Sequence, residues 1–162
     1  MEPAPRADEI DVAILRSLVQ DPDATNIAIS ESTGLARNTI RSRFARYRRD
    51  GTLRSFERLI EPAFLGFPLA AFLATTVTQR KLADVSATLA NIPEVTQVYG
   101  MSGAADLLVH VVARDANDLY RIAGNVLAIE GVKRTRTSLI MGELVEYRIA
   151  QLLSARPVAV PG

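Results

Sequence analysis

Basic side chains are concentrated in one short window of the sequence. Residues 37–58 hold eight basic and two acidic side chains, although the whole chain of 162 residues has a formal net charge of only +1. Such asymmetry indicates a localised anionic partner. No glutamate lies four residues from these arginines to pair with them along a helix, which favours nucleic acid over the alternative, a solvated basic surface helix.

The spacing of this window suits a helix that reads DNA. At about 100° of rotation per residue, Ile40, Phe44 and Tyr47 form one apolar stripe, and a short, polar, basic face lies opposite. A recognition helix needs side chains that reach base edges, with arginines for the phosphates. The candidate DNA-binding residues are Arg37, Asn38, Thr39, Arg41, Ser42, Arg43, Arg46, Arg49 and Arg54.

The elements that must position this face are short helices. Apolar spacing predicts helices over residues 8–20, 25–33 and 37–50. Gly34 should end the second helix in a left-handed turn, whereas Ala36 offers no side-chain cap to the third. Two short helices joined by a glycine-containing turn indicate a helix-turn-helix. Residues 53–60 read as extended, either a wing or a strand that leads to a linker.

The rest of the chain predicts a second domain. Strand patterns over 69–78, 95–101, 106–113 and 132–141 alternate with helical patterns over 82–90 and 115–129, in the ferredoxin-like order βαββαβ. The fold class is therefore α+β, with a winged helix-turn-helix domain over 1–60, a linker over 61–68, a dimerisation and effector-sensing domain over 69–150, and a tail over 151–162.

The predicted strands are apolar on both faces, although helices can cover only one face of such a sheet. A second copy is the simplest cover for the other face, and a homodimer also suits an operator with two half-sites.

With these residues placed, the sequence from about Asp8 to Tyr147 resembles the Lrp/AsnC (feast/famine) family of transcriptional regulators. In the first domain the resemblance rests on Asp11–Leu15, Gly34–Leu35, Thr39–Arg43 and Gly51–Leu53. In the second it rests on Ile92–Val95, Gly103–Leu108 and Gly131–Ser138. The resemblance implies dimers, often assembled into octamers, that bend or wrap double-stranded DNA and hold an amino acid or related metabolite between subunits.

The resemblance places the effector near the loop that spans residues 99–106. The candidate effector-binding residues are Tyr99, Gly100, Met101, Ser102, Gly103, Ala104, Asp106, Thr135 and Thr137. Ala104 and Ala105 depart from the family pattern, in which an acidic or polar residue followed by an aromatic one is more usual. Asp106 could accept from an ammonium group or simply open a strand. The two threonines alternate with arginines, as is also ordinary for a half-exposed strand.

Enzymatic interpretations rank lower. The chain has no cysteine and one histidine, His110, which rules out a Cys/His metal set, so we expect no cofactor and no metal. A sirohaem-decarboxylase-like enzyme on the same architecture is a minor alternative, but Glu94–Tyr99 lacks the histidines of those enzymes. A DNA-organising protein of low sequence specificity is another alternative. The start of the chain is charged and no apolar run could span a membrane, so a cytoplasmic, sequence-specific regulator is predicted.

Overall fold

A computed structural model describes residues 6–154. Their contacts divide the chain into two compact units, one formed by the residues up to Ser55 together with those from Val145, the other by Phe56–Leu144. Within the described residues no helix is both long and apolar enough to cross a membrane.

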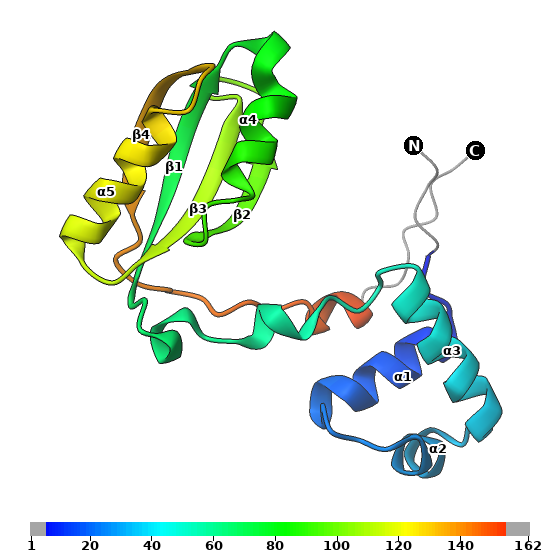
Figure 1. The fold of residues 1–162 in the computed structure, drawn as a ribbon. Coiled ribbons are helices and arrows are strands. Elements are labelled where there is room, and N and C mark those ends of the chain that lie inside the picture. The colour runs from blue at the N-terminus through cyan, green and yellow to red at the C-terminus, as the bar shows by residue number, and fades with distance from the viewer. Residues whose placement is uncertain (1–5, 155–162) are drawn as a thin grey trace. The chain divides into compact units, whose positions relative to one another are not determined.

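Three helices form the first unit, as predicted: α1 (Glu9–Gln20), α2 (Asn26–Thr33) and α3 (Arg37–Arg49) (Figure 1). Asp8 and Asp11 cap α1 reciprocally, each side chain accepting from the backbone N–H of the other. Gly34 ends α2 with a φ of 73°, the left-handed conformation that glycine adopts without strain. α3 begins at Ala36 without a side-chain cap. The core of the unit consists of Ile14, Ile29, Ile40 and Tyr47.

The prediction of an extended segment over residues 53–60 is wrong. Phe56–Leu59 is instead a 3₁₀ turn, η1, and Pro62–Leu65 forms another, η2, within the predicted linker. An extended segment becomes a strand only where a neighbouring strand supplies hydrogen bonds. The four strands of the described sheet pair only among themselves.

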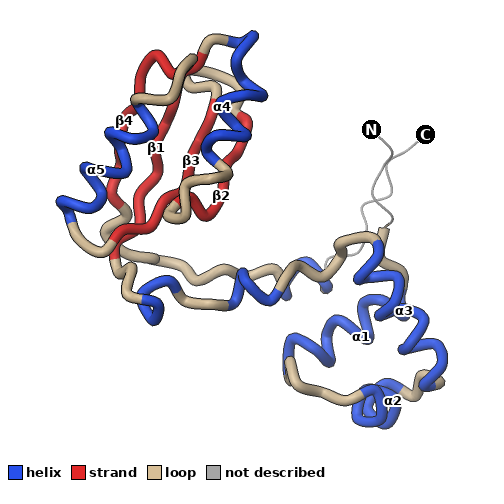
Figure 2. The backbone as a smooth tube through the Cα atoms, viewed as in Figure 1, coloured by secondary structure: helices blue, strands red, loops and turns tan. Residues whose placement is uncertain are grey.

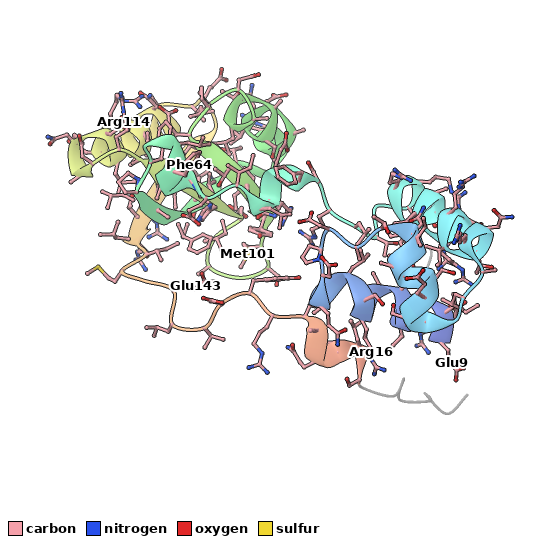
Figure 3. All side chains as sticks on the ribbon, turned by 90° about the horizontal axis from the view of Figure 1, so that it is seen from below. Glu9, Arg16, Phe64, Met101, Arg114 and Glu143 are labelled. Atoms are coloured by element: carbon pink, nitrogen blue, oxygen red, sulfur yellow. The ribbon has the colours of Figure 1, made fainter. Side chains whose placement is uncertain are left out.

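The end of the described chain returns to the first unit. Ala150–Leu153 forms a 3₁₀ turn, η4, which contacts α1. The Arg16 guanidinium donates to the Leu153 carbonyl at 3.1 Å and lies beside this turn (Figure 3). The sequence predicted a C-terminal tail over 151–162. The described part of that tail, up to Ser154, packs on α1, and the remainder lies outside the described residues.

The second unit has the predicted βαββαβ order: β1 (Leu69–Val77), α4 (Leu82–Leu89), β2 (Val95–Gly100), β3 (Leu107–Ala113), α5 (Ala116–Leu127) and β4 (Val132–Leu139). The strands lie in the order β2-β3-β1-β4, and every neighbouring pair is antiparallel. Both helices cover the same face of the sheet (Figure 2). The ferredoxin-like prediction is confirmed.

Strand parity decides which side chains lie beneath those helices. In β1, Leu73 and Thr75 are fully buried on the helix-covered face. Because successive side chains of a strand point to opposite faces, Phe72 and Ala74 lie on the open face. Residues paired across neighbouring strands point to the same face of the sheet. Leu108 of β3 and Arg136 of β4, which both pair with Ala74, therefore lie on the open face.

Candidate DNA-binding face and effector loop

The predicted reading face of α3 is exposed. Its polar and basic members with high exposure are Arg37, Asn38, Arg41, Ser42, Arg48 and Arg49. Arg49 donates to Asp50 at 2.9 Å, whereas Arg37, Arg41 and Arg48 have no ion-pair partner among the described residues. Arg48 was missing from the sequence-based candidates, although its rotation places it between Arg37 and Arg41 on the helix, which was the signal that could have found it.

Two of the candidate arginines turn away from this face toward α1. Arg43 Nη1 lies 2.8 Å from Asp11 Oδ1 and 2.7 Å from Asp8 Oδ2. Arg46 Nη2 lies 2.6 Å from both oxygens of Asp11. The absence of a glutamate four residues away along α3 therefore does not leave Arg43 and Arg46 without an anionic partner. Their partners belong to another helix, where spacing along α3 cannot reveal them.

Asp11 is the centre of this arrangement and is 1% exposed. Burial by itself raises the pKa of a carboxyl group, but hydrogen bonds from Tyr47, the Asp8 backbone, Arg46 and Arg43 outweigh it and lower the pKa of Asp11 well below its usual range. The Tyr47 hydroxyl donates to Asp11 Oδ1 at 2.7 Å. Burial, followed by this bond, raises the pKa of Tyr47, which keeps the hydroxyl a donor.

Two further candidates lie at the margins of the reading face. Thr39 is half-buried on α3. Arg54 is exposed beyond the end of the helix, with no ion-pair partner among the described residues. α3 thus has two sets of arginines, one exposed and one held against α1.

The predicted effector loop connects β2 to β3. Gly103 has a φ of 125°, in the region that favours glycine, and the Met101 N–H donates to the Asp106 carbonyl at 2.8 Å. The Asp106 carboxylate accepts from the Val77 N–H at 2.8 Å and from the Gln79 amide at 2.6 Å. Each of its oxygens therefore already holds a donor, in agreement with the interpretation of Asp106 as the residue that opens a strand.

The remaining effector candidates divide between two faces. Tyr99 pairs with Leu108 on the open face and is exposed, and Gly100, Met101 and Ser102 follow it at the exposed end of the strand. Thr135 and Thr137 pair with Thr75 and Leu73, on the side that the helices cover.

A small hollow on the open side of the sheet is lined by residues that differ from most of the predicted effector candidates. It is lined by Ala74, Thr76, Ala104, Ala105, Arg134 and Arg136. The structure thus brings Ala104 together with the two arginines of β4, not with its two threonines.

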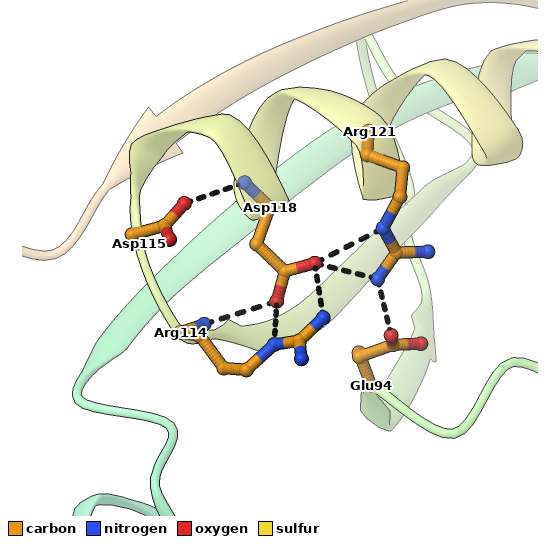
Figure 4. A network of polar contacts seen from close by, with 5 residues as sticks. All are labelled: Glu94, Arg114, Asp115, Asp118 and Arg121. Carbon is orange, nitrogen blue, oxygen red and sulfur yellow. Dashed lines mark hydrogen bonds and ion pairs between the residues drawn. The ribbon is translucent and has the colours of Figure 1, made fainter.

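A second carboxylate network holds the start of α5 (Figure 4). Asp118 accepts from Arg114 Nε at 3.1 Å and from Arg121 Nη2 at 2.7 Å, and Arg121 also pairs with Glu94. The Arg114 hydrogen bonds, followed by those from Arg121, lower the pKa of Asp118 well below its usual range. Asp115 caps the helix by accepting from the Asp118 N–H at 2.8 Å.

The single histidine lies on the open face of the sheet. His110 Nδ1 is hydrogen-bonded to the Thr96 hydroxyl, and the imidazole lies 5.0 Å from the Phe72 ring. Burial lowers the pKa of His110 below its usual value. Among the described residues, no group of three or more His, Cys, Asp or Glu side chains could hold a metal ion.

A helix-turn-helix unit joined to a ferredoxin-like unit defines a class of two-domain DNA-binding regulators. Residues 8–54 match the winged helix-turn-helix DNA-binding family model, and residues 70–150 match that of the Lrp/AsnC ligand binding domain. The chain belongs to the Lrp/AsnC family of transcriptional regulators.

Its relatives include two regulators from different organisms. It is 33% identical to the HTH-type transcriptional regulator FL11 of Pyrococcus horikoshii over 83% of this chain and 89% of that one. It is 34% identical to the regulator AldR of Mycolicibacterium smegmatis over 85% and 82%, respectively.

Solved structures agree in fold. The feast or famine regulatory protein of M. tuberculosis, in complex with L-methionine, superimposes with a TM-score of 0.77 at 27% identity, covering 88% of this chain and 97% of that one. E. coli AsnC gives a TM-score of 0.80 at 20% identity, with coverage of 90% and 99%, and shows the fold alone.

Proposed function

We propose that this transcriptional regulator binds the major groove of double-stranded operator DNA through the exposed face of α3. The observation that carries the proposal is the division of the α3 arginines. Asp8 and Asp11 hold Arg43 and Arg46, whereas Arg37, Arg41 and Arg48 stay exposed beside Asn38 and Ser42. Exposed arginines can reach phosphates, and short polar side chains between them can reach base edges.

The test is a fluorescence-anisotropy titration of operator DNA from upstream of the protein's own gene against a scrambled fragment, over a range of salt. We expect preference for the upstream fragment and a steep salt dependence, since log K falls by about 0.9 per phosphate contact for each log unit of salt. Arg41→Ala with Arg48→Ala should lower that slope by about 2 per protomer. Arg80→Ala, an exposed arginine of the second unit, is the matched control.

Two outcomes of this titration would change the proposal. Equal binding to both fragments would favour the second candidate, a DNA-organising protein of low specificity. Unchanged binding by the Arg41→Ala, Arg48→Ala variant would contradict the assignment of α3 as the reading helix.

The functional form in this proposal is a homodimer built on the open face of the sheet. Phe72 and Leu108 remain partly exposed there, although both are apolar, and a symmetric copy would cover them. Phe72→Asp should give a monomer by light scattering, with weaker operator binding. Tyr120→Ala, on the exposed side of α5, should leave association unchanged. Light scattering also distinguishes a dimer from an octamer.

In the same proposal the second unit senses an amino acid or related small metabolite and no reaction is catalysed. The match of residues 70–150 to a ligand-binding domain and the L-methionine complex of a structural relative support the effector. The involvement of His110 with Thr96 and Phe72 supports a structural role for the only histidine.

A further inference from the structure

The hollow on the open side of the sheet has an unusual balance of charge. Two arginines, Arg134 and Arg136, line it together with Thr76 and alanines, and no acidic side chain does. Neither arginine has an ion-pair partner among the described residues of one chain. The hollow lies on the face that the proposed homodimer would use, so a ligand in it would lie at the interface between the two copies. Two guanidinium groups on one side of one strand repel each other unless an anion lies between them.

Asp106, the carboxylate of the adjacent loop, forms no ion pair with either arginine among the described residues. Asp106 accepts from the Val77 N–H and from the Gln79 side chain, one donor on each oxygen. The two loop residues that do line the hollow are Ala104 and Ala105, whose side chains are methyl groups. The hollow therefore offers positive charge and a small apolar surface, and no carboxylate lines it to pair with an ammonium group.

Register fixes the spacing of the two arginines along the backbone. Arg134 pairs with Thr76 and Arg136 with Ala74, so both lie on the open side of β4, two residues apart. Two residues along a strand correspond to about 6–7 Å. A guanidinium binds a carboxylate through two parallel hydrogen bonds. A short carbon chain with a carboxylate at each end could satisfy both arginines while its methylene groups contact the alanines.

We propose that this hollow binds a small dicarboxylate, and that the effector of this regulator is therefore an acidic metabolite, not a neutral amino acid. The inference rests on the proposed function in that it names the ligand class of the effector-sensing unit. A neutral α-amino acid has one carboxylate for two arginines, and its ammonium group would lie near their positive charges. A dicarboxylate neutralises both guanidinium groups, and the Thr76 hydroxyl can donate a further bond.

The test is calorimetric titration of the full chain with glutarate, 2-oxoglutarate and glutamate, with glutaramide as the uncharged isostere and leucine and methionine as neutral amino acids. We expect at least one dicarboxylate to bind, and glutaramide not to bind. Arg134→Gln with Arg136→Gln should weaken that binding by more than tenfold. Lys133→Gln, an exposed charge next to Arg134 that does not line the hollow, should leave it unchanged. Unfolding midpoints of the variants report whether the fold is intact.

The outcomes separate this inference from the proposed function. Binding of leucine or methionine but of no dicarboxylate would overturn the ligand class and leave an amino-acid regulator. Dicarboxylate binding that the arginine variant retains would overturn the site. Absence of all binding in a chain that still selects operator DNA would overturn the inference alone, whereas loss of operator selection would count against the proposed function whatever binds in the hollow.

Discussion

Asp11 and Asp118 are nearly buried carboxylates that each accept hydrogen bonds from two arginines, but their connections differ in range. The arginines of Asp11 lie 32 and 35 residues away, on another helix. Those of Asp118 lie four residues before it and three after it. The first carboxylate fastens α3 to α1, and the second holds the start of α5 to its own first turn. The same chemistry thus positions α3, the helix proposed to read DNA, in one unit and begins a helix in the other.

Removal of the long-range carboxylate should have the largest effect. Asp11→Ala leaves Arg46 without a carboxylate partner and Arg43 with Asp8 alone. Removing one partner of a buried ion pair costs about 3–5 kcal/mol, and the partial exposure of the two arginines places the expected loss at the lower end of that range. Denaturant unfolding measures the loss. Glu9→Ala, an exposed carboxylate in the first turn of the same helix, is the matched control and should change stability little. Equal effects of the two substitutions would contradict the tertiary role of Asp11.

Removal of only the hydroxyl donor should cost less. Tyr47→Phe keeps the buried ring but takes one hydrogen bond from the Asp11 carboxylate, while Arg43 and Arg46 remain. A hydrogen bond to a charged group contributes about 1.5–3 kcal/mol. The same unfolding titration should place this variant between the wild type and Asp11→Ala. A loss as large as that of Asp11→Ala would show that the hydroxyl, not the arginines, holds the carboxylate.

The local arrangement should respond more weakly to loss of its cap. Asp115→Ala removes the side chain that accepts from the Asp118 N–H, and an N-cap contributes about 1 kcal/mol. Asn117→Ala, exposed in the first turn of α5, serves as the control. Hydrogen exchange of the α5 amides would show whether the loss is confined to this helix, as a local role predicts.

Acid should weaken both arrangements, with no effect at neutral pH. Because folding lowers the pKa of Asp11 and Asp118, their stabilisation is complete above the unfolded value of about 4 and is lost as the pH falls below it. The free energy of unfolding should therefore decline below about pH 4. The decline should be shallower in Asp11→Asn, as denaturation at several pH values would show. An unchanged slope would mean that Asp11 has an ordinary pKa in the folded chain.

The sequence predicted those parts of the structure that depend on neighbours along the chain. Periodicities of 3.6 and 2 located the helices and strands, and Gly34 ended α2 as expected. The sequence did not predict which face of the sheet each β4 side chain lies on, because the alternation of Thr135 and Arg136 does not say which residue faces the helices. Only the pairing of Thr135 with Thr75 decides it.

The same limit applies to the candidate DNA-binding face. The rotation of α3 correctly predicted which side chains are exposed opposite Ile40 and Tyr47. It could not show that Asp11 would accept from Arg43 and Arg46, because that pairing depends on how α1 packs. The prediction of an extended segment over residues 53–60 was wrong for a related reason, since a strand depends on a partner that its own residues do not specify.

Because residues 150–153 pack on α1, they must be included in any fragment designed to contain the whole first unit. In order of sequence, the ferredoxin-like unit is an insertion between two segments that pack together, in the way that one domain is placed inside another. A fragment cut after Ser55 would lose the partner of Arg16. An isolated DNA-binding module that keeps every contact of the first unit would be made by splicing residue 55 to residue 145, not by truncation.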